Sequence, residues 1–294
     1  DSLEALLADA TLAAVYIAVP HSHLAALATR ALQAGKHVLV EKPMATRLAD
    51  ADALVALADS KRLALGVFFE LRHSAGNIRA RALLQAGAIG SVIGVHSQTL
   101  IDKPASYWQV GYAGRNHSAW RSLKAEAGGG VVLMNTSHAL DTIRWVTGLE
   151  VVRVAGEVDT LVATGVEVED SATASLRFNN GALGSLFVGA HLAGASKDEH
   201  ITIYGTEGQL RLPYPYGPDP LNVFFRREWG GLAANEWHVL ADPQAPIYAR
   251  AVDDFAQAVQ DGRPAPTSGR DARQVLAIVL GLYQSSAEHS VVSL

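Results

Sequence analysis

The sequence predicts an α/β protein: part of a doubly wound, Rossmann-type parallel sheet, followed by an α+β domain with an open, mostly antiparallel sheet. Up to about residue 72, short runs of continuous apolar residues alternate with helical segments, which is typical of parallel strands covered on both faces. From residue 73 onward, polar and apolar residues alternate, which indicates strands with one face on a core. We therefore expect two domains, 1–72 and 73–294.

The first domain is expected to form a strand–helix–strand–helix–strand series. The predicted strands cover 13–20, the apolar triplet Val38–Val40 and 63–70, and the predicted helices cover 22–34 and 47–60. Ligands of such sheets bind outside the carboxyl ends of the strands. That rule selects the segments Pro20–His23, Glu41–Pro43 and Glu70–His73.

The second domain is expected to combine strands with long helices. Predicted strands cover 91–101, 150–161, 168–178, 182–192, 199–204 and 208–212, and predicted helices cover 74–87, 131–147, 247–261 and 270–287. We expect the last helix to pack back towards the first domain. The segment 102–127, which carries Tyr107, Trp108 and His117, reads as a long polar loop that could form a lid.

The composition excludes several classes of function. A net charge of −5 argues against binding to nucleic acid or to an anionic membrane, because both need a basic face. The chain has no cysteine, and its 11 histidines show no helical H-x-x-x-H spacing with a carboxylate, so we expect no metal site. No apolar run approaches the ~18 residues of a membrane span. We expect a globular, cytoplasmic protein.

Glu41-Lys42-Pro43 is the first candidate for chemistry, because it follows a buried strand at the ligand edge of the sheet. A desolvated lysine has a lowered pKa, which suits proton transfer near neutral pH. We expect that the Lys42–Pro43 bond could be cis. On spacing alone, the favoured interpretation is a glutamate and a lysine that cap the strand in solvent.

The segment AVPHSHLAALATRALQAGKHVLVEKPMA, residues 18–45, closely resembles the Gfo/Idh/MocA family of nicotinamide-dependent sugar and polyol oxidoreductases. Its specific part is the run from Gly35 to Pro43. The resemblance continues through ALLQAGAIGSVIGV at 82–95, then Trp120-Arg121, Gly128–Gly130 and His138-x-x-Asp141, and it ends in LYQSSAEHSVVSL at 282–294. It covers essentially the whole chain.

The resemblance implies a site and its ligands. Lys42 would relay the proton of the substrate hydroxyl, and His138 would hydrogen-bond the reacting oxygen. The expected contacts of the NAD or NADP cofactor are Pro20, His21, His23, Glu41, Lys42, Trp120, Arg121 and Tyr283, and Arg72 is added from its place after the third strand. The implied substrate is a sugar or polyol. The implied assembly is a homodimer or homotetramer formed through the sheet of the second domain.

Position 134 departs from the family pattern. Many dehydrogenases of the family carry an aspartate one helical turn before the histidine, where this chain has Met134. A methionine neither shuttles protons nor accepts strong hydrogen bonds. Three interpretations stay open: a dehydrogenase working with Lys42 and His138, a variant that uses bound NAD transiently (a lyase, epimerase or glycosidase), and a non-catalytic sugar- or NAD-sensing regulator.

The front of the Rossmann motif is not part of this sequence. A dinucleotide fold holds the pyrophosphate on a G-x-G-x-x-G turn after its first strand, and none of the 294 residues forms that pattern. Aligned with the family, Asp1 falls inside a later helix, so about 55–65 residues of the βα pattern would precede it. We expect a protein that starts at Asp1 to bind NAD(P) weakly or not at all.

Overall fold

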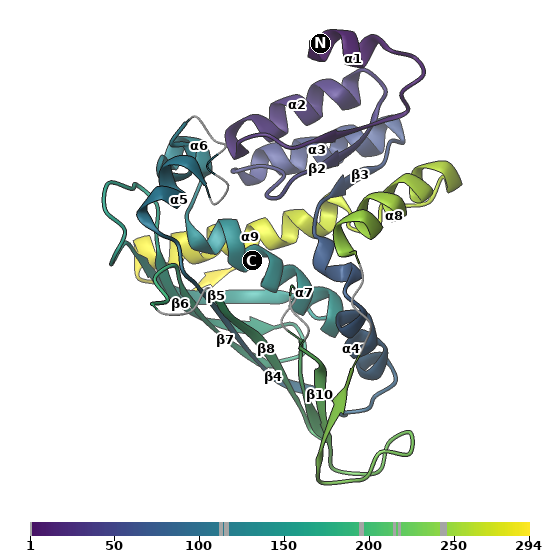
Figure 1. Ribbon diagram of the computed structural model, residues 1–294, viewed down its shortest axis with the longest axis vertical. Helices are drawn as coiled ribbons and strands as arrows, with labels where there is room; N and C mark the ends of the chain where they lie inside the picture. Colours follow the sequence, from purple (N-terminus) through teal and green to yellow (C-terminus); the bar gives the residue numbers. More distant parts are fainter. Residues whose placement is uncertain are drawn as a thin grey trace.

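The computed structural model places a small parallel sheet at one end of the molecule and a large mixed sheet at the other (Figure 1). The structure describes residues 2–111, 114, 118–193, 197–213, 216, 219–241 and 246–294. Asp1 and His117 therefore lie outside the described residues. The predicted fold class is confirmed.

The small sheet confirms the predicted βαβαβ series. In chain order its elements are α1 (Leu3–Ala8), β1 (Ala14–Ile17), α2 (His21–Gln33), β2 (His37–Val40), α3 (Leu48–Lys61) and β3 (Leu65–Val67). The strands are parallel in the order β1-β2-β3. Val38 and Val40 are fully buried in the middle strand, as expected for a triplet covered on both faces. Strand β3 is shorter than the predicted 63–70, because a 3₁₀ turn, η1 (Glu70–His73), begins immediately after Phe69.

Among the described residues, the large sheet has nine strands in the order β11-β10-β9-β8-β4-β7-β6-β5-β12. They are β4 (Val92–Ile101), β5 (Val151–Asp159), β6 (Ser171–Phe178), β7 (Leu183–Gly189), β8 (Lys197–Gly205), β9 (Gly208–Arg211), β10 (Leu221–Phe225), β11 (Trp237–Leu240) and β12 (Val292–Ser293). Strands β4 and β7 pair in parallel, and the other pairings described for this sheet are antiparallel. The last three strands were not predicted.

Helices cover one face of this sheet and join it to the small sheet. They are α4 (Ala75–Gln85), α7 (Ser137–Thr147), α8 (Ile247–Asp261) and α9 (Gly269–Glu288). Helix α9 packs on β5 and also on α3 and β3, so it contacts both sheets (Figure 1). It begins with a capping box of Ser268 and Asp271.

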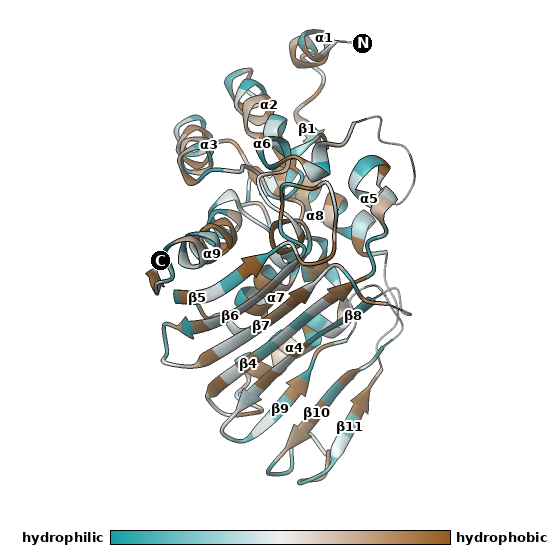
Figure 2. Cartoon of the chain, turned by 90° about the vertical axis from the view of Figure 1, so that its left-hand side faces the viewer, coloured by the Kyte–Doolittle hydropathy of each residue, from teal (hydrophilic) through white to brown (hydrophobic). Residues whose placement is uncertain are grey.

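The opposite face of the large sheet is open and carries apolar side chains (Figure 2). Leu183, Phe187 and Tyr204 are 55%, 48% and 41% exposed. Leu183 and Tyr204 flank Gly94 in the same cross-strand row, because Gly94 pairs with both. The sheet therefore has a helix-covered face and an open face, on which exposed apolar side chains lie among polar ones such as His96 and Ser185.

Two segments differ from the expectation. The supposed loop 102–127 contains α5 (Ala105–Val110), η2 (Trp120–Ser122) and α6 (Lys124–Ala127), and its Tyr107 and Trp108 are buried. The predicted helix 131–147 starts as a π-helix, η3 (Val132–Thr136), before α7. The π-turn changes the side-chain directions around Met134, so the α-helical spacing assumed there was wrong.

Two findings concern the described residues only. In that part of the chain, no helix is long and apolar enough to cross a membrane. Within the same residues, no group of three or more histidine, aspartate or glutamate side chains is arranged to hold a metal ion.

Candidate active site

Glu41 and Lys42 lie at the carboxyl end of β2, at the edge of the small sheet that faces the second domain. The Lys42–Pro43 bond is cis, as considered from the sequence. The Tyr16 hydroxyl donates to Glu41 Oε1 at 2.6 Å, and the Lys42 backbone N–H donates to Glu41 Oε2 at 3.2 Å. Glu41 is therefore fixed by its neighbours, whereas the side chain of Lys42 turns towards the second domain.

The Lys42 ammonium contacts the segment that carries the family departure. Its Nζ donates to the backbone carbonyl of Met134 at 2.6 Å. Burial lowers the pKa of Lys42, and Arg121 lowers it further, while Glu41 and Glu70 act in the opposite direction. A buried lysine held only by a carbonyl loses its proton more readily than a lysine in solvent, which is the property a proton relay needs.

His138 lies at the start of α7 beside Glu70, the first residue of η1. His138 Nδ1 and Glu70 Oε2 are 3.5 Å apart, and neither atom has a hydrogen-bond partner among the described residues. Phe69 packs edge-on against the His138 ring, with 5.7 Å between the ring centroids. Burial lowers the pKa of His138 well below its ordinary value, and the charges of Lys42 and Lys197 add to the effect. The ring is therefore neutral at neutral pH.

Glu70 is the carboxylate that sequence reasoning did not assign to the catalytic set. It is 2% exposed, and burial raises its pKa. The Tyr216 hydroxyl donates to its Oε1 at 2.6 Å, which leaves Oε2 facing His138. The only sequence signal for Glu70 was its place at the end of the third strand.

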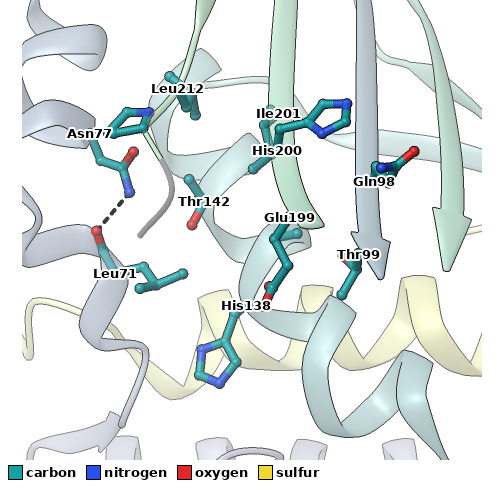
Figure 3. Close-up of a pocket in the computed structure, with 12 residues that line it drawn as sticks. Leu71, Asn77, Gln98, Thr99, His138, Thr142, Glu199, His200, Ile201 and Leu212 are labelled. Carbon is teal, nitrogen blue, oxygen red and sulfur yellow. Dashed lines mark hydrogen bonds between the residues drawn. The ribbon is translucent and has the colours of Figure 1, made fainter. Parts of the chain in front are cut away.

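A pocket with several polar side chains in an otherwise apolar lining opens beside His138, between the large sheet and helices α4 and α7 (Figure 3). Gln98, Thr99 and Glu199 line it from the sheet, and Asn77, His138 and Thr142 line it from the helical side. The Asn77 side-chain oxygen and the Thr142 hydroxyl have no partner among the described residues. Such a mixture of donors and acceptors suits a ligand with several hydroxyl groups.

Five predicted cofactor contacts lie at or near the start of α2. Pro20 precedes the helix and His23 is exposed on its first turn. His21 Nδ1 donates to the carbonyl of Ala127 at 2.8 Å, and its ring meets Trp120 edge-on at 4.7 Å. Burial lowers the pKa of His21 to about 3. The Arg121 guanidinium lies 4.4 Å from the Trp120 ring. The structure thus brings His21, Trp120 and Arg121 to the same sheet edge as Lys42.

Tyr283 belongs to a separate hydrogen-bond network around Glu169. Its hydroxyl donates to Glu169 Oε1 at 2.8 Å, and the Glu169 carboxylate also accepts the backbone N–H groups of Gly130 and Val132. A Cβ on Gly130 would lie 1.8 Å from the Glu169 carbonyl oxygen. This close approach explains the glycine turn 128–130 and shows that it serves packing. The Tyr283 hydroxyl is occupied in this arrangement.

Arg72 is buried in an ion pair instead of facing a ligand. Its guanidinium contacts both carboxylate oxygens of Asp141, at 2.6 and 2.8 Å, and donates to the carbonyl of Pro266 at 3.2 Å. Asp271 lies 3.4 Å away. These partners use the guanidinium within the protein, so we leave Arg72 out of the proposed cofactor contacts.

The residues at the carboxyl edge of β1 and β2 fit the nicotinamide end of a dinucleotide. The edge presents a fixed carboxylate, Glu41, that can accept ribose hydroxyls, beside the ammonium of Lys42. The turn that would hold the pyrophosphate is not among these 294 residues. The fit therefore concerns the nicotinamide and its ribose.

A parallel βαβ sheet whose carboxyl edge carries a low-pKa lysine, opposed by a histidine from a second sheet domain, defines a dinucleotide-dependent oxidoreductase. Family models agree over most of the chain. Residues 1–69 match the oxidoreductase family with an NAD-binding Rossmann fold, and residues 78–211 match the GFO/IDH/MocA C-terminal domain. The chain belongs to the Gfo/Idh/MocA family of oxidoreductases.

Relatives extend over nearly the whole sequence. The chain is 30% identical over 290 residues to 1,5-anhydro-D-fructose reductase of Ensifer adhaerens, covering 97% of this chain and 81% of the relative. It is 24% identical to myo-inositol 2-dehydrogenase of Thermotoga maritima, covering 98% and 82%. The solved structure of levoglucosan dehydrogenase in complex with NADH and levoglucosan superposes with a TM-score of 0.86 and 25% identity, covering 99% of this chain and 82% of that one.

Proposed function

We propose that the protein transfers a hydride reversibly between NAD(P) and a secondary alcohol or carbonyl of a sugar or polyol. The observation that carries the proposal is the approach of Lys42 to the Met134 carbonyl, beside the neutral His138 and its pocket. The named relatives are consistent with this chemistry, since they are sugar and inositol oxidoreductases.

In this proposal, the nicotinamide supplies or accepts the hydride when it is bound, and the chain manages the proton. Lys42 Nζ, in its neutral form, takes the hydroxyl proton during oxidation and returns it during reduction. Its carbonyl partner at Met134 orients the amine without neutralising it by an ion pair. Glu41 and the residues around His21 would bind the ribose and hold the nicotinamide end in place.

Glu70 is proposed to position His138. A proton on Nδ1 that faces the Glu70 carboxylate leaves Nε2 as an acceptor for the substrate hydroxyl, and so fixes the useful tautomer. The Tyr216 hydroxyl holds the other Glu70 oxygen. This pair provides a carboxylate close to the histidine although position 134 is a methionine.

Glu70→Gln is expected to lower kcat/KM about 10–100-fold, because the amide no longer fixes the His138 tautomer. Replacing the anion by a neutral amide also removes a charge that raises the Lys42 pKa, so the acid limb of the pH profile, which follows Lys42, moves to lower pH. A pH series of kcat/KM for both proteins checks this, with Glu70→Asp as the variant that restores the carboxylate. An unchanged acid limb in Glu70→Gln would assign Glu70 a purely structural role.

The function itself is tested on the full-length protein, which is incubated with saturating NAD or NADP and a panel of sugars and polyols. We expect NADH or NADPH to accumulate in proportion to the oxidised product. Product without net reduced nicotinamide would show that the cofactor is used transiently. Binding of ligands with no product under any condition would support the regulatory alternative and would refute the proposal.

We also propose that copies of the chain associate through the open face of the large sheet. Leu183, Phe187 and Tyr204 form the apolar part of that face. Phe187→Glu is expected to shift the protein to a smaller species in light scattering coupled to size exclusion, because it places a charge in an apolar contact. Leu161→Glu, on a loop outside the sheet and 66% exposed, serves as control. An unchanged mass for Phe187→Glu would argue against this interface.

A further inference from the structure

Lys103 is a buried lysine that the mechanism above does not use. It follows the carboxyl end of β4, where its backbone N–H donates to the carbonyl of Ala190 at 3.2 Å. Its side chain is 6% exposed, and Nζ has no hydrogen-bond acceptor in the described part of the chain. Burial lowers the pKa of Lys103 well below its ordinary value, and the charge of Lys42 adds to this effect.

Lys36 is a buried lysine of the same protein whose ammonium group does have hydrogen-bond acceptors. It is 7% exposed, almost the same as Lys103, but its Nζ donates to the carbonyls of Asp9 and Leu12 at 2.6 and 2.8 Å. Buried ammonium groups are costly unless they are paired in this way. The missing acceptor at Lys103 therefore needs an explanation other than packing.

The Lys103 ammonium packs against two aromatic rings. Its Nζ lies 3.8 Å from the Tyr107 ring centroid and 5.5 Å from that of Trp108. The Tyr107 hydroxyl in turn donates to Met134 Sδ at 3.8 Å. The backbone carbonyl of Met134 accepts the hydrogen bond from Lys42 Nζ. A single tyrosine and a single methionine thus separate the two ammonium groups.

The charge around these two lysines is not balanced by ion pairs. Within the described residues, neither Lys42 nor Lys103 has a carboxylate at ion-pair distance. Glu169 is held by two backbone N–H groups and a tyrosine hydroxyl, and Glu70 is held by Tyr216. Glu199 acts on Lys103 only at longer range, from the wall of the pocket. Met134 leaves position 134 without the acid that the family pattern places there.

We propose that Lys103 binds a carboxylate of the substrate, so that the protein acts on a sugar acid or a carboxylated polyol. The proposal rests on the proposed function, because it places this carboxylate in the same site as the hydroxyl that Lys42 deprotonates. The substrate carboxylate would approach Nζ from the side of Glu199, which lines the pocket and acts on Lys103. The negative charge of the substrate carboxylate would replace that of the aspartate which the family pattern places at position 134.

The test compares acids with their neutral partners: D-glucuronate with D-glucose, and D-galacturonate with D-galactose. Calorimetric titration measures binding, and reduced nicotinamide measures turnover. We expect each acid to bind more tightly than its partner, and Lys103→Met to weaken acid binding and to lower kcat/KM for acids about 10–100-fold, with little change for neutral sugars. Lys61→Met, an exposed lysine outside the site, controls for net charge.

Thermal unfolding separates this role from a structural one. Removing a buried ammonium that has neither a hydrogen-bond acceptor nor a carboxylate partner among the described residues is expected to leave the midpoint of Lys103→Met unchanged or raised. A marked fall in the midpoint would assign Lys103 to packing and overturn the proposal. A raised KM for NAD(P) with an unchanged KM for the acids would overturn it in favour of a cofactor contact.

The remaining outcomes are also distinct. Equal binding of acids and neutral sugars contradicts the proposal even if the protein oxidises both. Tight, Lys103-dependent binding of the acids without any redox turnover supports the anion site and refutes the proposed oxidoreductase function instead.

Discussion

Lys42→Ala is expected to reduce kcat about 10²–10⁴-fold, the range that general acid–base groups contribute. Within the described part of the chain, the side chain makes one hydrogen bond, to the Met134 carbonyl, so its removal disturbs few other contacts. Steady-state rates and a thermal unfolding curve on the same preparation separate lost chemistry from lost folding.

Lys42→Arg provides the matched control for charge. A guanidinium keeps the positive charge but does not release its proton at accessible pH, so this variant is expected to be inactive too. In the native protein, alcohol oxidation needs the neutral amine, so kcat rises with pH through the Lys42 pKa. Burial places that pKa below the ordinary lysine value. Full activity in Lys42→Arg would contradict a proton relay at this position.

Arg72→Met is expected to destabilise the protein by about 3–5 kcal/mol, because it leaves the Asp141 carboxylate buried without its partner. Asp141 is fully buried, and Arg72 contacts both of its oxygens as well as the Pro266 carbonyl. These contacts join η1 to α7 and to the segment before α9. Since whole proteins are stable by about 5–15 kcal/mol, the loss is large. Chemical denaturation measures it.

Two controls sharpen that experiment. Arg72→Met combined with Asp141→Leu removes both charges and is expected to recover much of the stability. Arg270→Met breaks an exposed pair with Asp59 and is expected to leave the unfolding midpoint almost unchanged. A small effect of Arg72→Met alone would show that Arg72 is available to a ligand after all.

Local patterns predicted those parts of the fold that local physics decides. The continuous triplet Val38–Val40 became the central parallel strand, and the helix predicted at 247–261 has those bounds in the structure. The short strands β10 and β11 escaped prediction because four or five residues carry little periodicity. The π-turn at 132–136 also has no local signal, since it is a deviation within a helical sequence.

Residues of the candidate site were predictable from the sequence only where they belong to a motif of the family. Lys42 and His138 followed from a family pattern, and the structure brings both to the region between the two sheets. Glu70 and Lys103 come from strand ends that are far apart in sequence, and only the tertiary fold shows that one faces His138 and the other lacks an acceptor. The ion pair of Arg72 could not be predicted from the sequence for the same reason, since its partner Asp141 lies 69 residues away along the chain.

Isotope transfer tests the central claim most directly. The protein is supplied with NAD(P) and a substrate that carries deuterium on the carbinol carbon, and the reduced nicotinamide is examined for deuterium. The account predicts that the deuterium moves to the nicotinamide in the native protein and that Lys42→Ala slows this transfer about 10²–10⁴-fold. Loss of the deuterium to solvent, or equal transfer by Lys42→Ala, would contradict it.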